Sequence, residues 1–336
     1  MASNIRPIIF LKTAATKPTQ EQLVFLITAI FLMFFAIFLD GFATIDNFIT
    51  LARNISVLGI LGVGMAIVVI ARGLDLSQVS VMAVSTAWAL THMNDGVSLG
   101  LAIALGLGMA LVVGLMNGFL IAFLEMPALF ATLASGIFVF GVVRTWLLGG
   151  DLIFHVPKDA EEFLFLGQGT LGGIPIPILV FALVALLSHL FLSRTSYGRF
   201  IYAHGDNAEA ASLTGIAVRP LTILEYTLCA FIGYLAGLVM VASVANVDTR
   251  IINSTLIFDT ILVVVLGGVS LIGGRGSILS VIAGTALIGT LLNGMTLMDF
   301  TNEVQNIIKG LVLLCAILID NRLHPRDEET AQQGDL

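Results

Sequence analysis

The feature that most constrains this chain is a series of long, almost uninterrupted apolar runs that fills most of its length. Each run is about as long as the 17 to 25 residues that an α-helix needs to cross a bilayer. Hydrophobic residues make up 58% of the 336 residues and charged residues only 11%. This leaves too little polar surface to cover a water-soluble globular protein. The sequence therefore predicts an integral membrane protein that is embedded in a lipid bilayer.

About ten such runs are present, and each is predicted to form a helix. They cover residues 23–39, 55–70, 74–92, 97–124, 128–148, 174–192, 221–245, 256–272, 277–298 and 304–319. The second and third runs are separated by only a short turn, so one of them could be re-entrant or broken, and eight to ten spans are expected. Barrel strands would alternate polar and apolar residues, which these runs do not. The predicted fold is an all-α, polytopic membrane protein.

Lys and Arg residues in the short loops predict the orientation, because they gather on the cytoplasmic side. With ten spans and a cytoplasmic N-terminus, ten of the 15 Lys and Arg residues fall inside and five outside. Residues 1–22 would then be a cytoplasmic leader, 23–320 the transmembrane domain and 321–336 a cytoplasmic tail. Within the transmembrane domain, loop 149–173 would be external and loop 193–220 cytoplasmic.

The cytoplasmic loop contains a polar, Ala-rich segment, HGDNAEAASLTGI, at residues 204–216. Asp206 or Asn207 is suited to capping the start of a helix, because a short polar side chain can accept a hydrogen bond from the first turn. Glu209 would lie in that first turn, where the helix dipole favours an anion. Gly215 would end the helix.

Small side chains such as Ala210 and Ala211 in this segment would let another backbone approach closely. The segment is therefore either a short helix that docks in a groove of a partner protein or a solvated helix that joins two spans.

Five sequence motifs resemble those of permease subunits of bacterial ATP-binding-cassette importers. The type is that of the ribose, xylose, arabinose and galactose permeases, within the branched-chain permease superfamily. Each motif is weak alone, but five in the order of the family, spread over nearly the whole chain, are specific. They are GLDLS (73–77), GLMNGFLIAFLEMPALFATLAS (114–135), GDNAEAASLTGI (205–216), FDTILVVVLGGVSLIGGRGS (258–277) and QNIIKGLVLLCAILID (305–320).

The resemblance implies a permease subunit of the bacterial inner membrane that forms the pathway for a small hydrophilic solute, a monosaccharide or related polyol. It implies three kinds of protein partner: cytoplasmic ATPase subunits, a periplasmic solute-binding protein, and a second permease subunit that is identical or paralogous. Nucleic acid is not expected as a partner. The resemblance also implies a coupling helix that contacts the ATPase, formed by Gly205, Asp206, Asn207, Glu209, Ala210, Ala211 and Gly215.

The chain contains no phosphate-binding loop of the form Gly-x-x-x-x-Gly-Lys-[Ser/Thr], so it is not expected to be an enzyme that hydrolyses ATP. No cofactor or metal is expected in this chain, and ATP and Mg would be bound by the partner ATPase. The alternative is an ion-coupled secondary transporter or channel, with Glu225, Asp75 or Asp259 as the coupling acid.

Uncharged hydrogen-bonding side chains within the spans are the candidates for contact with solute hydroxyls. Asn117, Thr132 and Asn293 are of this kind, although such residues also bond one helix to another. Gln78 is a fourth candidate, because members of the resembling family usually carry a small residue there.

The sequence also predicts the surroundings of five other side chains. Glu225 should face a cavity or a partner, or reach water at the nearby inner interface. Asp75 is expected at the inner boundary of the membrane and Asp259 near the outer boundary. Cys229 and Cys315 lie inside apolar runs and are expected to be buried, inert thiols.

Overall fold

The computed structural model of the protein describes residues 20–323. Most of the predicted leader and tail therefore lies outside the described residues. The long helices are α1 (Gln20–Phe38), α2 (Ile45–Ile70), α3 (Gln78–Asn94), α4 (Leu99–Ala122), α5 (Ala128–Val142), α7 (Ile176–Arg194), α10 (Val218–Val244), α12 (Ile278–Leu297) and α13 (Asn302–Leu323). The shorter helices are α6 (Glu161–Gln168), α8 (Ser196–Asp206), α9 (Ala208–Leu213) and α11 (Leu256–Gly267).

All ten predicted runs contain a helix, which confirms an all-α, polytopic membrane fold. By length and composition, seven helices in the described part of the chain are able to cross a membrane. They are α1, α2, α4, α5 with the π-helical turn that follows it, α7, α10 and α12. The other three predicted spans contain α3, α11 and α13.

Two predicted spans have different bounds in the structure. The run 256–272 forms a helix of only 12 residues, about 18 Å at 1.5 Å per residue, which is shorter than a bilayer core. It ends because Gly268 takes a left-handed conformation (φ 111°), which breaks the helical path. Helix α2 begins at Ile45, ten residues before the predicted run. The prediction missed its first turns because their polar residues lower the local hydropathy.

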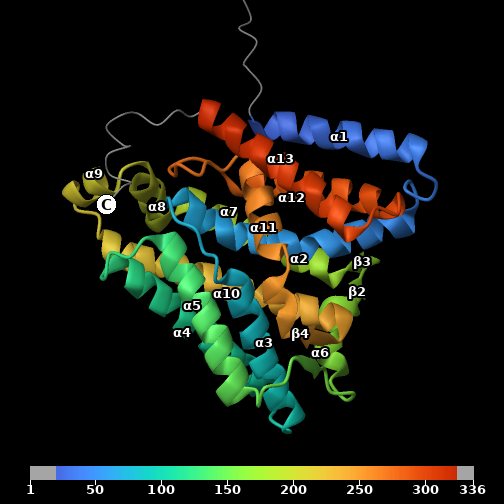
Figure 1. The fold of residues 1–336 in the computed structure, drawn as a ribbon, viewed down its shortest axis with the longest axis horizontal. Coiled ribbons are helices and arrows are strands. Elements are labelled where there is room, and N and C mark those ends of the chain that lie inside the picture. Colours follow the sequence, from blue (N-terminus) through green and yellow to red (C-terminus); the bar gives the residue numbers. More distant parts are fainter. Residues whose placement is uncertain (1–19, 324–336) are drawn as a thin grey trace, which may run out of the picture.

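Helices α2 and α10 form the centre of the molecule, with α3 and α4 packed on α10 and with α11 and α12 packed on α2 (Figure 1). Small residues allow the closest of these contacts. A Cβ atom at Gly118 of α4 would lie 2.5 Å from the Cα atom of Ile223 in α10, so a larger residue would push these helices apart. Residues 58–70 of α2 are all buried.

The two loops that were predicted to lie on opposite sides of the membrane lie at opposite ends of the fold (Figure 1). Loop 193–220 forms α8 and α9 at one end. Loop 149–173 forms β1 (Ile153–His155), α6 and β2 (Thr170–Leu171) at the other. There β1 pairs antiparallel with β4 (Asn246–Asp248), and β2 pairs with β3 (Ile174–Pro175).

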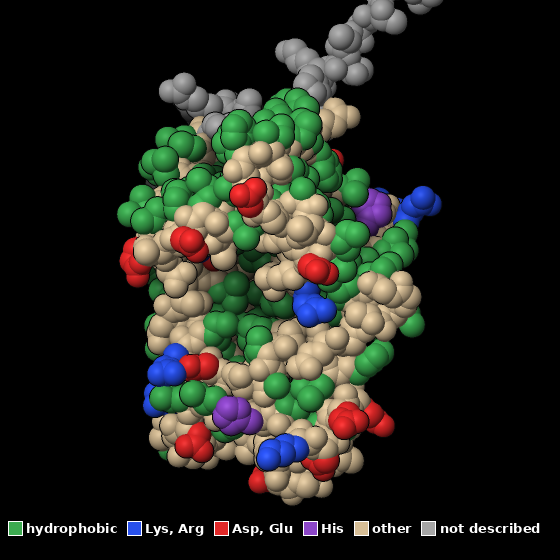
Figure 2. Space-filling model, turned by 90° about the vertical axis from the view of Figure 1, so that its right-hand side faces the viewer, with side chains coloured by type: hydrophobic (Ala, Val, Ile, Leu, Met, Phe, Trp, Pro, Cys, Tyr) green, Lys and Arg blue, Asp and Glu red, His purple; other side chains and the backbone are tan. Residues whose placement is uncertain are grey.

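The face at the β-strand end carries charged side chains around a hollow with hydrophobic walls (Figure 2). One exposed ion pair lies in the short turn after β4, where Arg250 Nη2 is 2.6 Å from Asp248 Oδ2. Hydrogen bonds from Arg250 hold the pKa of the Asp248 carboxyl below its usual value.

Candidate functional site

The predicted coupling segment, residues 205–215, is not one helix: Gly205 and Asp206 end α8, and the rest forms α9 and the turn after it. Thr195 Oγ1 accepts a hydrogen bond from Gly198 N (3.1 Å) and caps α8. Asn207 has an extended backbone, and its Oδ1 accepts a hydrogen bond from Ala210 N (2.9 Å), which caps α9. Of the two caps that the sequence proposed, the structure uses Asn207. Gly215, at φ 90°, reverses the chain after α9 in a conformation that other residues rarely adopt.

The end of α8 lies tightly against the ends of other helices. A Cβ atom at Gly205 would lie 1.8 Å from the carbonyl oxygen of Ile70, at the end of α2. That same oxygen accepts a hydrogen bond from Gly274 N (2.8 Å), in the loop between α11 and α12. Tyr202 OH donates to Gly276 O (2.8 Å) in the same loop. Helix α8 is therefore seated on α2 and on the α11–α12 loop at once.

A buried polar contact also joins α8 to α10. His204 Nδ1 in α8 lies 3.1 Å from Glu225 Oε1 in α10, and these side chains are 12% and 1% exposed. The expectation that Glu225 would face a cavity or a partner is confirmed, because it lines a cavity and contacts His204. The option that it simply reaches water at the interface is wrong, because the end of α8 covers it.

A cavity of about 550 Å³ separates α9 from the turn between α4 and α5. Glu209 and Ser212 line its α9 side, while Ile121 and Glu125 line the opposite side. The remaining polar lining residues include Arg72, His204, Arg219, Glu225 and Tyr226.

The outer face of α9 is open. Ala211 is buried against the rest of the protein, whereas Ala210 is exposed. Leu213, the last residue of α9, is 83% exposed. The α9 helix thus presents small and apolar side chains away from the helix bundle, at an end of the molecule.

A second polar cluster holds the break between α2 and α3. Ser77 N and Ser77 Oγ both donate to Asp75 Oδ1. Asn117 Nδ2 in α4 donates to Ser77 Oγ (2.8 Å), and Thr132 Oγ1 in α5 accepts from Leu76 N (3.1 Å). Two predicted pathway residues, Asn117 and Thr132, therefore bind the loop that interrupts the α2–α3 hairpin.

Gln78, the third of these candidates, begins α3 beside that cluster and is fully buried. Its Nε2 donates to Leu61 O of α2 (2.9 Å). Its Oε1 and the Asn117 Oδ1 have no hydrogen-bond partner among the described residues. Buried carbonyl oxygens without a partner are unusual in folded proteins.

The fourth candidate, Asn293, lies elsewhere. Its amide exchanges a pair of hydrogen bonds with the amide of Asn47, both at 3.0 Å, which joins α12 to the first turn of α2. The structure brings Gln78, Asn117 and Thr132 together but keeps Asn293 apart from them.

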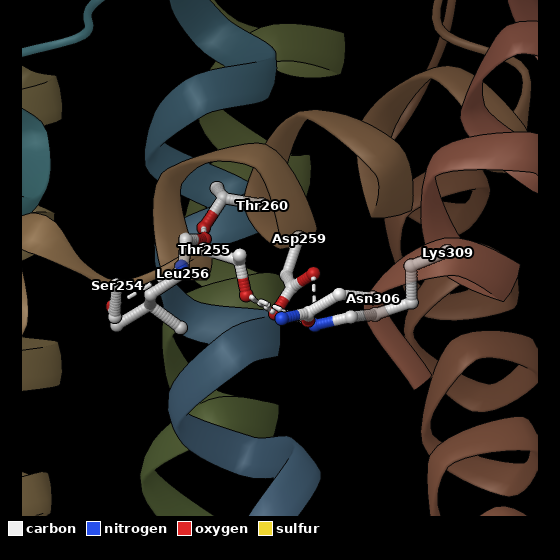
Figure 3. A network of polar contacts seen from close by, with 7 residues as sticks. All are labelled: Ser254, Thr255, Leu256, Asp259, Thr260, Asn306 and Lys309. Atoms are coloured by element: carbon white, nitrogen blue, oxygen red, sulfur yellow. Dashed lines mark hydrogen bonds and ion pairs between the residues drawn. The ribbon is translucent and has the colours of Figure 1, made fainter. Parts of the chain in front are cut away.

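The two acids that were expected at the membrane boundaries are both held by contacts within the protein. Asp75 is fully buried, because helices from distant parts of the chain cover its loop. Asp259 Oδ1 of α11 lies 2.8 Å from Lys309 Nζ of α13, and Thr255 Oγ1 also accepts from that amine at 3.0 Å (Figure 3). Sequence reasoning missed this pairing, because the only signal for it was that both residues were predicted on the same side of the membrane.

The two cysteines differ in the structure. Cys229 is buried as expected, whereas Cys315 is exposed on the surface of α13, so its predicted burial is wrong. An apolar helix that faces lipid gives the same sequence pattern as one that faces protein. Within residues 20–323, no group of three or more His, Cys, Asp or Glu side chains is arranged to hold a metal ion.

Comparisons with known proteins agree with the resemblance seen in the motifs. Residues 47–317 match the family described as the branched-chain amino acid transport system / permease component. No solved structure gave a significant match.

Among similar proteins, the ribose import permease protein RbsC of Escherichia coli K12 is 33% identical over 282 residues, which is 84% of this chain and 88% of the relative. RbsC of Bacillus subtilis 168 is 34% identical over 276 residues, 82% of this chain and 85% of the relative. The L-arabinose transport system permease protein AraH of Escherichia coli K12 is 32% identical over 287 residues, 85% of each chain. The chain belongs to the family of branched-chain amino acid transport system permease components.

Proposed function

We propose that this protein is the inner-membrane permease subunit of an ATP-driven importer for a monosaccharide or a related polyol. The observation that carries the proposal is the match over more than four fifths of the chain to permeases that are named for ribose and L-arabinose transport. The permease would form the membrane pathway, and ATP and Mg would be bound by separate ATPase subunits.

The contact with the ATPase is proposed to be α9 and the residues around it. Three observations support this: Asn207 and Gly215 fix the ends of the short helix, its face at Ala210 and Leu213 is open, and it lies at the opposite end from loop 149–173. A partner groove that covers Leu213 would remove an exposed apolar side chain from water. Closure of the ATPase subunits around ATP would then move α9 and shift the permease between inward- and outward-open states.

The periplasmic solute-binding protein is proposed to deliver the solute at the end that carries β1 and β4, where charged side chains surround a hollow (Figure 2). A second permease subunit would complete the pathway. Inside the bundle, Gln78 and Asn117 are the side chains proposed to contact the solute, because each has a carbonyl oxygen without a partner in the described structure. Hydroxyl groups of a sugar donate to such oxygens.

The contacts of the acids favour the importer over the ion-coupled alternative. Glu225 contacts His204, Asp259 pairs with Lys309, and Asp75 accepts two hydrogen bonds from Ser77. An ion-coupling acid has to exchange its ion with water, and in this structure each of the three is held by a protein partner.

Transport by purified components tests the proposal. The permease would be purified from its native membrane, the proteins that accompany it identified, and the complex reconstituted in liposomes with labelled ribose and L-arabinose. We expect uptake that requires ATP inside the liposomes and the solute-binding protein outside. Uptake by the permease alone, driven by a proton or sodium gradient, would show the ion-coupled alternative to be right.

A further inference from the structure

We infer that His204 and Glu225 are positioning residues that transmit the movement of the coupling segment to α10. The inference rests on the proposed function, because it concerns how motion at an ATPase contact reaches the membrane helices. It assigns a role to the buried polar contact between α8 and α10, which lies outside the exposed docking surface on α9.

The direct route from α9 into the bundle is interrupted. The cavity of about 550 Å³ lies between α9 and the α4–α5 turn, so a push on α9 in that direction moves it into open space. The covalent connection from α9 to α10 is the turn at residues 214–217, in which every residue but Ile216 is exposed and Gly215 has φ 90°. A short exposed turn with a glycine is a poor transmitter of force, because its backbone dihedrals can absorb the displacement.

Helix α8, in contrast, is in firm contact with the membrane helices. Gly205 lies against the end of α2 and Tyr202 bonds to the α11–α12 loop. His204 lies between these two residues in sequence and reaches Glu225, which is two turns inside α10. Motion of α8 therefore has a side-chain connection to the helix that packs on α2, α3 and α4.

The burial of Glu225 makes this connection firm. Its side chain is 1% exposed, so separation from His204 would leave a buried carboxyl group without its imidazole partner. Loss of its partner is unfavourable for a polar group with so little exposure, although Glu225 also lines the cavity. The contact is therefore expected to stay closed while α8 and α10 move, so that the two helices move as one body.

The test compares variants in the complete complex of permease, ATPase and solute-binding protein in liposomes. The variants are Glu225→Leu, His204→Leu, the double variant, and Glu225→Gln, which keeps a hydrogen-bonding group beside His204. The matched control is Glu125→Gln, which breaks the exposed ion pair with Arg219 at the rim of the same cavity. The readouts are co-purification of the ATPase, its basal hydrolysis, and the number of solute molecules transported per ATP.

We expect Glu225→Leu to retain the ATPase and its basal hydrolysis while solute transported per ATP falls by on the order of tenfold, a typical coupling effect. His204→Leu should give a similar loss, and the double variant should lose no more than either single variant, since both remove one interaction. Glu225→Gln and Glu125→Gln should stay near the wild-type ratio.

An unchanged ratio in Glu225→Leu, or losses that multiply in the double variant, would overturn the inference. If Glu225→Leu does not assemble, His204→Leu on the more exposed partner decides in the same way. A wild-type permease that binds no ATPase, or imports no solute with ATP, would instead refute the proposed function, so the two failures are distinct.

Discussion

Lys309 Nζ in α13 lies 2.8 Å from Asp259 Oδ1 in α11, and the two side chains are only 11% and 14% exposed. The same amine donates to Thr255 Oγ1, just before α11 begins (Figure 3). Helix α11 is too short to cross the membrane alone. The ion pair therefore connects the first turn of this short helix to α13.

Replacing Lys309 with Met should destabilise the protein by about 3 kcal/mol, because it leaves the Asp259 carboxylate without its cation in a largely buried site. Lys309→Arg keeps the charge and should cost much less. The double variant Asp259→Asn, Lys309→Met should recover much of the lost stability, since no uncompensated charge remains. Thermal unfolding of the purified permease in detergent measures these differences. A double variant as unstable as Lys309→Met would contradict the explanation.

The sequence predicted the elements that depend on local patterns. The apolar runs located the helices, and the polar cap at Asn207 and the turn at Gly215 located the ends of α9. The length of α11 could not be read from hydropathy, because Gly268 stops the helix while the apolar pattern continues to Ile272.

The contacts of Glu225, Asp259 and Asp75 could not be predicted from the sequence. Hydropathy places a residue along its own span but does not say which distant helices cover it. Glu225 contacts His204, which is 21 residues away in the sequence. Asp259 forms an ion pair with Lys309, which is 50 residues away. Asp75 is covered in the same way.

Gly205→Ala should displace α8, because the added Cβ atom would lie 1.8 Å from the backbone oxygen of Ile70. Neither the backbone of α2 nor that of the Gly274 loop can move away cheaply. We expect a loss of stability of about 2 kcal/mol, within the range for overpacking a tight site, and reduced solute uptake. Gly108→Ala in α4 is the control: nothing lies within 4 Å of its added Cβ atom. It should leave stability unchanged or raise it slightly. Equal melting temperatures for the two variants would argue against a tight seat for α8.

Gln78 and Thr132 should respond differently to loss of their polar groups. Gln78→Leu should raise the KM for solute uptake by on the order of tenfold if the free Oε1 accepts a solute hydroxyl, since a lost hydrogen bond is worth about 1 kcal/mol or more. Thr132→Val removes the oxygen that accepts from Leu76 N. It should lower stability by about 1 kcal/mol and leave the KM unchanged. Uptake kinetics and thermal unfolding separate the two effects, and a Gln78→Leu variant with a wild-type KM would remove Gln78 from the pathway.

Gly215→Leu should leave the permease folded but weaken its binding to the ATPase. A leucine at φ 90° costs about 1–2 kcal/mol of backbone strain, which shifts the turn after α9 and tilts the exposed Leu213. Gly41→Leu is a matched control, because Gly41 also has a positive φ (81°) and open space around its Cβ position. It lies between α1 and α2, away from α9. Both variants should lose similar stability. Titration of the ATPase onto the detergent-purified permease should show weaker binding only for Gly215→Leu, and equal loss of binding in both would mean that strain, and not a contact at α9, is responsible.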